Sequence, residues 1–124
     1  MEAHAERQEM KEAPIQKLIL NYLAATRVLA FRMNTGMAKM GGRIVRFGAP
    51  GMADIVAYPT CCAIPAVVWI ECKATDGRQS ELQKSFQKQV ERTGHVYILA
   101  KSLEDVKGVL EIESSISAMP TLRR

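Results

Sequence analysis

Residues 51–73, with the sequence GMADIVAYPTCCAIPAVVWIECK, decide how this chain folds. Two apolar runs, at 55–58 and 66–70, are rich in the β-branched and aromatic residues that favour strands. Charged residues stand at the ends of these runs, where an all-apolar strand would carry none: Asp54, Glu71 and Lys73. We therefore expect two neighbouring strands that carry charged side chains at their ends.

The alternation of side chains along a strand gives this pattern a chemical meaning. Glu71 and Lys73 point to one face, about 7 Å apart along the backbone, while Cys72 points to the other. If the two strands are neighbours, Asp54 meets Glu71, and two carboxylates held close repel unless a cation or a divalent metal offsets their charge. The pattern thus outlines a metal site. A plainer interpretation stays open, in which Glu71 and Lys73 are solvated strand-end residues or neutralise each other.

Length and composition indicate one intracellular domain. The chain has 124 residues, enough for a single two- or three-layer core, so we expect one domain over 1–124 with its core at about 9–113. No apolar run of about eighteen residues is present, and the polar N-terminus lacks the apolar stretch of a secretory signal, so we expect no membrane partner. The cysteines are odd in number and lack C-x-x-C spacing, which favours reduced thiols in a cytoplasm: Cys61, Cys62 and Cys72.

The basic residues are distributed unevenly. The formal net charge is +4, and no acidic residue lies between Glu12 and Asp54. Six basic residues lie there: Lys17, Arg27, Arg32, Lys39, Arg43 and Arg46. Any one of them is equally well explained as ordinary solvated surface, but as a group they favour a polyanion such as a nucleic-acid backbone.

The N-terminal half predicts a helix followed by a β-hairpin. Apolar residues over 15–23 follow the i, i+3, i+4, i+7, i+8 pattern of an amphipathic helix. Glu12 stands one turn earlier, where the helix dipole alone favours an acid. Residues 28–34 and 43–47 are typical of two strands, and the short Gly-rich segment between them predicts a hairpin with a mobile tip.

The C-terminal half predicts a helix, a strand and a second helix. Ser80 and Gln83 form an S-x-x-Q capping box, which begins a helix and also explains Gln83 without any catalytic role. The apolar stripe of that helix consists of Leu82, Phe86 and Val90. A strand at 95–100 and a helix from Ser102 follow, and 114–124 is expected to be a tail. The fold class is therefore α/β, a single-domain mixed sheet of about five strands flanked by helices.

The ordered set of polar residues resembles a nuclease family. Gly51-x-x-Asp54, a connection of sixteen residues and then Glu71-x-Lys73 are similar to the core of the PD-(D/E)XK nuclease superfamily, with its restriction-endonuclease-like fold. More narrowly, the chain resembles the VRR-NUC (virus-type replication-repair nuclease) domain over about residues 9–110. Four further pieces carry this resemblance: Glu12-x-x-x-Gln16, Arg32-x-Asn34-x-Gly36, Gly77-Arg78-x-Ser80-x-x-Gln83 and Gly94-x-x-Tyr97.

The resemblance implies a metal-dependent phosphodiesterase. Asp54, Glu71 and the backbone carbonyl of Cys72 would bind Mg²⁺ or Mn²⁺, and Glu12 would complete the shell directly or through water. Glu9, one turn earlier, is the alternative to Glu12 because the helix start is uncertain. Lys73 would orient or deprotonate the attacking water or stabilise the transition state. Gln83 would position the water or the scissile phosphate.

The same resemblance implies a DNA substrate and a symmetric dimer. A set of basic and polar residues would contact the nucleic acid: Arg32, Asn34, Lys39, Arg43, Arg46 and Arg78. A chain without a separate DNA-binding module would span a branched duplex as a two-fold dimer, as Holliday-junction-resolving enzymes of DNA repair or phage origin do. Two alternatives stay open. One is a nuclease of flaps, duplex ends or RNA, and the other is a non-catalytic nucleic-acid-binding module on the same fold.

Overall fold

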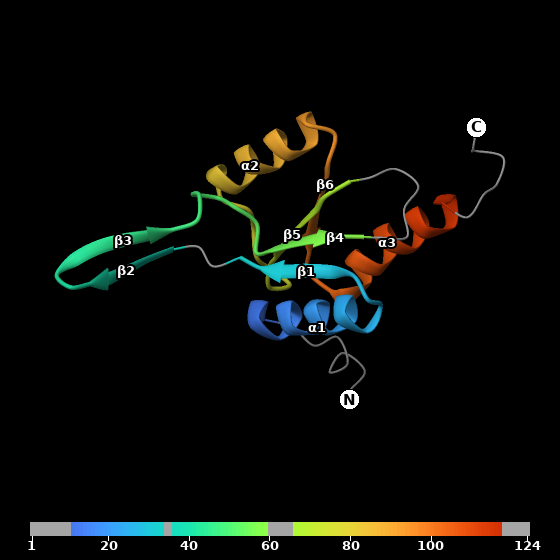
Figure 1. The fold of residues 1–124 in the computed structure, drawn as a ribbon, viewed down its shortest axis with the longest axis horizontal. Coiled ribbons are helices and arrows are strands. Elements are labelled where there is room, and N and C mark those ends of the chain that lie inside the picture. The colour runs from blue at the N-terminus through green and yellow to red at the C-terminus, as the bar shows by residue number, and fades with distance from the viewer. Residues whose placement is uncertain (1–10, 34–35, 60–65, 118–124) are drawn as a thin grey trace.

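The computed structural model describes residues 11–33, 36–59 and 66–117, without the side chains of 36–38, 45–47 and 112–117. The described chain forms a mixed four-stranded sheet with three helices in a single domain, together with a separate two-stranded hairpin (Figure 1). The elements in chain order are α1 (Glu12–Ala25), β1 (Leu29–Arg32), β2 (Gly36–Met40), β3 (Arg43–Phe47), β4 (Ile55–Tyr58), β5 (Val68–Cys72), α2 (Glu81–Arg92), β6 (Val96–Ala100) and α3 (Leu103–Ser117).

The main sheet has the strand order β1-β4-β5-β6. The pairs β1–β4 and β4–β5 are antiparallel, and Ile55 lies opposite Ile70 in the second of them. The pair β5–β6 is parallel, because α2 carries the chain back across the sheet before β6 begins. The predicted neighbouring strands are therefore adjacent, and they form the centre of the sheet.

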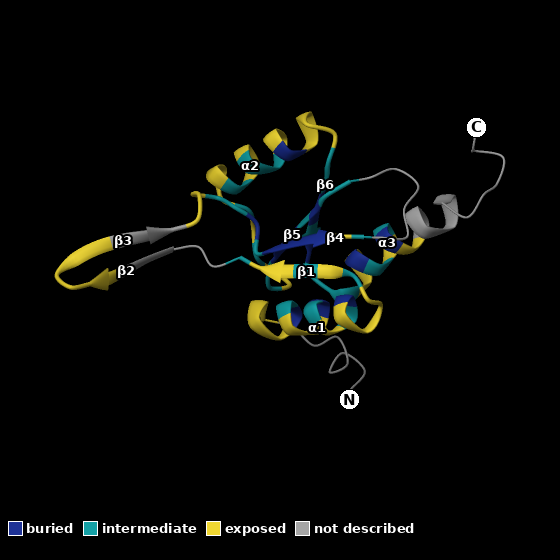
Figure 2. Cartoon of the chain, in the orientation of Figure 1, coloured by how far each residue is buried: buried dark blue, intermediate teal, exposed yellow. Residues whose placement is uncertain are grey.

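Helices α1 and α3 cover one face of the sheet, where the larger part of the core lies (Figure 2). The predicted stripe of α1 supplies Ile15, Ile19 and Leu23, each fully buried. These side chains pack against alternate residues of the central strands, among them Ile70 and Cys72. Cys72 is thus a buried apolar-like residue on the face opposite its neighbour Glu71.

Helix α2 covers only part of the other face. Val90 of α2 is buried with Tyr97, and Phe86 packs edge-on against Trp69, with 5.1 Å between the ring centroids. The helix begins at the predicted capping box of Ser80 and ends before Gly94, whose φ is +86°. Leu82, expected in the buried stripe, is 58% exposed; it lies in the first turn of α2, where its backbone carbonyl faces Gly51.

The predicted hairpin between strands at 28–34 and 43–47 is wrong. The first of these strands, β1, ends at Arg32 and pairs with β4 at the edge of the main sheet. The segment expected to be a turn contains β2, which pairs with β3 around Gly41 and Gly42. Both glycines have positive φ, +58° and +78°, as the central residues of a two-residue hairpin turn require.

Other boundaries differ from expectation by a few residues. Strand β5 runs to Cys72, two residues beyond the apolar run, so that Glu71 is part of the strand. The main sheet has four strands in the described chain, where about five were expected. Helix α3 continues to Ser117, so residues 114–117 are helical and not tail, and 118–124 lie outside the described residues. None of the described helices has the length and apolarity needed to cross a membrane.

Candidate active site

The charged residues gather where β4 begins and β5 ends. Because β4 and β5 are antiparallel, the residue that precedes β4 lies beside the last residues of β5. Asp54 stands at that point, and its carbonyl accepts a 2.6 Å hydrogen bond from the N–H of Met33, just past β1. The N–H of Lys73 is bonded to the carbonyl of Ala100 at 2.9 Å. Backbone hydrogen bonds at the ends of all four strands of the main sheet thus fix this end of the sheet.

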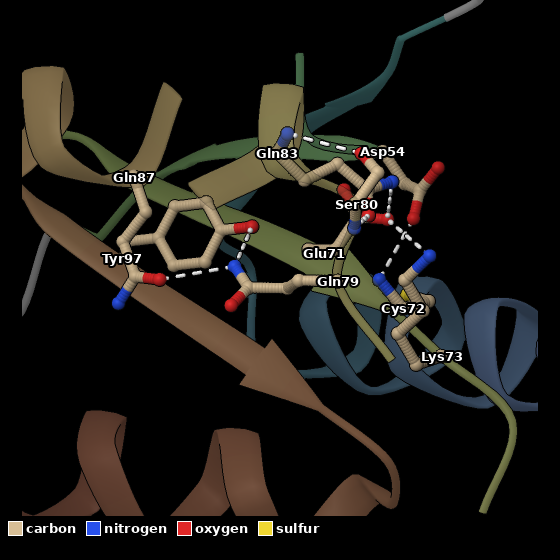
Figure 3. A network of polar contacts seen from close by, with 9 residues as sticks. All are labelled: Asp54, Glu71, Cys72, Lys73, Gln79, Ser80, Gln83, Gln87 and Tyr97. Atoms are coloured by element: carbon tan, nitrogen blue, oxygen red, sulfur yellow. Dashed lines mark hydrogen bonds and ion pairs between the residues drawn. The ribbon is translucent and has the colours of Figure 1, made fainter. Parts of the chain in front are cut away.

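Asp54 is held by the backbone of the neighbouring strand. Its Oδ2 accepts a 2.7 Å hydrogen bond from the N–H of Cys72, and the side chain is half-buried (Figure 3). Burial raises the pKa of Asp54 above its usual value, and the Cys72 N–H and the charge of Lys73 oppose this shift. The bond aims the carboxyl of Asp54 toward the last residues of β5.

Glu71 is the buried partner in this pair of carboxyls. It is 2% exposed, its Oε2 lies 3.8 Å from Nζ of Lys73, and the same oxygen accepts a 2.9 Å hydrogen bond from Nε2 of Gln83. Burial, followed by the nearby charge of Asp54, raises the pKa of Glu71 to about 8. Because the charge of Asp54 acts on Glu71 in this way, the protonation of one carboxyl depends on that of the other.

Gln83 links α2 to Glu71. Its Oε1 accepts a 2.8 Å hydrogen bond from the N–H of Ser80, while Oγ of Ser80 accepts a 3.1 Å bond from the N–H of Gln83. This is the predicted capping box, and the amide nitrogen of the same side chain remains available for Glu71. One side chain therefore caps the helix, as predicted, and also holds the buried acid, a contact that the sequence did not predict.

Gly51 allows the loop before Asp54 to contact the start of α2. Its φ is +81°, and a Cβ built there would collide with the backbone carbonyl of Leu82 and lie 3.0 Å from the nitrogen of Gln83. A residue with a side chain would therefore meet both backbone strain and a steric clash. The glycine of the G-x-x-D pattern thus brings Asp54 and Gln83 to the same site.

The donor atoms at this site fit a hard divalent cation. Oε1 of Glu71 is buried and has no hydrogen-bond partner among the described residues. Such an oxygen costs stability unless something occupies its lone pairs, and carboxylate oxygens are the ligands that Mg²⁺ and Mn²⁺ prefer. The described residues hold no group of three His, Cys, Asp or Glu side chains suited to a metal, so the protein would supply two carboxylates.

Glu12 lies near this pair without contacting it. It stands in the first turn of α1, and its side chain is exposed. Its charge contributes to raising the pKa of Glu71 and of Cys72, whose thiol pKa burial raises to about 12. Helix α1 therefore brings an acid within electrostatic range of the site. Glu9, the alternative, lies outside the described residues.

The predicted nucleic-acid-binding residues divide into three groups. Arg32 is exposed at the end of β1, close enough to Asp54 to lower its pKa, and Arg78 is exposed before α2. Lys39 and Arg43 are exposed on the β2–β3 hairpin. Asn34 lies outside the described residues, as does the side chain of Arg46.

A polar group next to the site was missed by the sequence analysis. Nε2 of Gln79 donates to Oη of Tyr97 at 3.1 Å and to Oε1 of Gln87 at 3.0 Å (Figure 3). Tyr97 is 8% exposed, and burial raises its pKa to about 12. The available signal was a tyrosine within an otherwise apolar strand, since a buried phenol needs a hydrogen-bond partner. This group ties the segment before α2 to β6.

Comparison of the chain with protein-family models, with curated proteins and with solved structures found no match. The resemblance to the PD-(D/E)XK pattern therefore depends on the residues themselves and on the geometry in which they meet.

Proposed function

We propose that the protein is a metal-dependent nuclease of the PD-(D/E)XK type, close to the VRR-NUC domain, that hydrolyses phosphodiester bonds in DNA. One observation carries the proposal. Oδ2 of Asp54 accepts a 2.7 Å hydrogen bond from the N–H of Cys72, the residue next to the buried Glu71, and Oε2 of Glu71 lies 3.8 Å from the ammonium of Lys73. Two acids and a lysine at the same strand ends are what metal-assisted phosphodiester hydrolysis needs from the protein.

The ligands for Mg²⁺ or Mn²⁺ would be Asp54, Glu71 and the carbonyl of Cys72, with water in the remaining positions. When bound, the ion would supply charge stabilisation for the transition state and lower the pKa of a bound water. Two features support this assignment. Oε1 of Glu71 has no other partner in the described chain, and the pair of acids is held in place by backbone and side-chain hydrogen bonds. Glu12 would act through water.

Lys73 and Gln83 would serve the reaction from opposite sides of Glu71. Lys73 is mostly buried, with 13% of its side chain exposed, so its ammonium acts in a site that is partly protected from solvent screening. It would orient the attacking water or stabilise the charge that develops on the phosphate. Gln83 would hold the carboxyl of Glu71 in the orientation that leaves Oε1 available.

The proposed substrate is branched duplex DNA, such as a Holliday junction, cut by a homodimer. A short chain would place two sites on two strands by two-fold symmetry. The exposed apolar side chains of the β1 edge and of the end of β4 offer a surface for a second copy: Leu29, Phe31 and Tyr58. Measuring the size of the protein on junction DNA tests the proposed dimer. Nicking of one strand by a strictly monomeric protein would contradict it.

Replacement of Lys73 by alanine tests the proposed activity. We expect the wild-type protein to cleave members of a panel of branched and linear DNAs with Mg²⁺, and Lys73→Ala to lose nearly all cleavage, by a factor of about 100 or more, on the order typical of a residue acting on the transition state. The matched control is Lys84→Ala, which removes an exposed lysine paired only with Glu81 on α2 and should cleave normally. Equal rates for Lys73→Ala and wild type would contradict the proposal.

A second candidate function is nucleic-acid binding without hydrolysis. It is favoured by the small number of acids, since the described residues bring together two carboxyls and no third. In that case the ion pair of Glu71 with Lys73 would only stabilise the fold. The two functions differ in metal binding, because a binding module has no need for clustered acids that face a phosphate.

A further inference from the structure

The β2–β3 hairpin, called here the ribbon (Gly36–Phe47), makes no extensive contact with the other described elements. Its two strands contact each other closely and make no comparable contact with another described element. It projects from the body of the molecule (Figure 1). An isolated two-stranded hairpin is at best marginally stable in water, so a ribbon of this kind is expected to act by binding something else.

The described side chains at the tip of the ribbon combine positive charge with apolar surface. Lys39 lies opposite Ile44, and Met40 lies opposite Arg43. Ile44 is 69% exposed and Met40 54% exposed, and both basic residues are exposed as well. No acidic residue occurs anywhere in the ribbon sequence, which also contains Arg46. This composition complements a polyanion that also offers apolar contacts, whereas two such ribbons from different copies would repel each other.

The ribbon is attached next to the candidate active site. Its first strand begins shortly after Met33, whose N–H donates a 2.6 Å hydrogen bond to the carbonyl of Asp54, and its second strand leads through Gly51 to Asp54 itself. Each strand has five residues and therefore reaches about 17 Å, roughly half of one turn of a DNA duplex. A duplex held at the tip of the ribbon would therefore lie within about one helical turn of Asp54 and Glu71.

We infer that the ribbon enters the major groove of double-stranded DNA and makes the duplex, not a single strand, the binding partner of this site. The major groove of B-DNA, about 12 Å wide, admits a two-stranded β-ribbon. Ile44, on the face that it shares with Lys39, lies against apolar base edges such as thymine methyl groups, and the long side chains of Lys39 and Arg43 contact phosphates along the walls. The major groove of A-form RNA is too deep and narrow for such an element. The inference deepens the proposed function and rests on it, because it names the substrate that the same site would cut.

The test is the affinity of the full-length protein for nucleic acids in EDTA, measured over a range of salt concentrations. The probes are a DNA duplex of about 20 base pairs, the corresponding RNA duplex and one DNA strand alone. We expect the double variant Lys39→Ala, Arg43→Ala to have a shallower slope of log K against log salt concentration for DNA-duplex binding. The slope should fall in magnitude by about 2, one unit for each phosphate that the variant no longer neutralises. Ile44→Ser should weaken duplex binding about tenfold with an unchanged salt dependence. Binding to RNA duplex and single strand, weaker from the outset, should change little.

The matched control removes two exposed basic residues from α2, Lys88→Ala with Arg92→Ala, and should leave duplex binding and its salt dependence unchanged. Thermal unfolding of the ribbon variants should match wild type, since the ribbon makes no extensive contact with another described element. Three results would overturn the inference: unchanged duplex binding by both ribbon variants, an equal loss with single strands, or a change in oligomeric state that identifies the ribbon as a subunit contact. If the ribbon binds the duplex but the protein cleaves no DNA, the proposed nuclease function is wrong and the inference about the ribbon stands.

Discussion

Glu71 is the residue on which the chemistry of the site depends. It is nearly inaccessible to solvent, faces a second acid, and has one oxygen occupied by Lys73 and Gln83 and one without a partner in the described chain. Without a cation, this arrangement favours the protonated acid, which is why its pKa is raised to about 8. A divalent cation that binds at this site would therefore displace the proton of Glu71.

The raised pKa of Glu71 predicts a loss of stability with rising pH in the metal-free protein. The folded state retains a proton that the unfolded chain releases near pH 4.5, so the stabilisation is complete below that pH and is lost as the pH rises through about 8. In EDTA, the melting temperature should therefore fall between about pH 5.5 and about pH 8.5. Glu71→Gln, which stays neutral, should show a distinctly smaller fall. Parallel pH profiles for the two proteins would contradict the burial of an ionisable Glu71.

The strands and helices show which elements the sequence could predict. The amphipathic pattern of α1 and the capping box of α2 could be predicted because each is a local signal in the sequence. Burial of Ile15 and the hydrogen bonds between Ser80 and Gln83 confirm them. The pairing of β1 with β4 could not be predicted, because the pairing of strands depends on partners that are distant in the sequence. The Gly41–Gly42 turn was the missed local signal, since two adjacent glycines with positive φ connect hairpin strands directly.

Gly51→Ala tests the contact between the loop before β4 and helix α2. The new Cβ would collide with the carbonyl of Leu82, so α2 must shift, and Gln83 would then move away from Glu71. We expect urea denaturation to show a loss of about 1–3 kcal/mol, from strain at positive φ and from the displaced helix, together with reduced cleavage.

Gly94→Ala provides a matched control for that variant. Gly94 has a similar φ, +86°, but nothing lies within 4 Å of the position of its Cβ. It should lose stability through backbone strain alone and keep its cleavage rate. If Gly51→Ala and Gly94→Ala behaved alike in both measurements, the close approach of Gly51 to α2 would have no role in the site.

At the scale of the whole molecule, the sequence predicted an α/β domain in which Asp54 and Glu71 lie on adjacent strands, and this arrangement is present. The alternation of side chains sufficed to separate Glu71 from Cys72, because it acts within one strand whatever surrounds the sheet. The separation of the ribbon from the main sheet and the identity of the partner of Tyr97 were not predictable, since they depend on how distant segments are placed. The unpaired oxygen of Glu71 was likewise visible only once the packing around it was known.

Metal binding measured by calorimetry tests the central claim, that Asp54 and Glu71 hold one divalent cation. We expect Mn²⁺ or Mg²⁺ to bind the wild-type protein at about pH 7 with release of about one proton, detected as a dependence of the heat on the ionisation enthalpy of the buffer, because Glu71 is mostly protonated below its pKa of about 8. Asp54→Asn should lose this binding. Equal heats for wild type and Asp54→Asn, or no proton release, would contradict the claim.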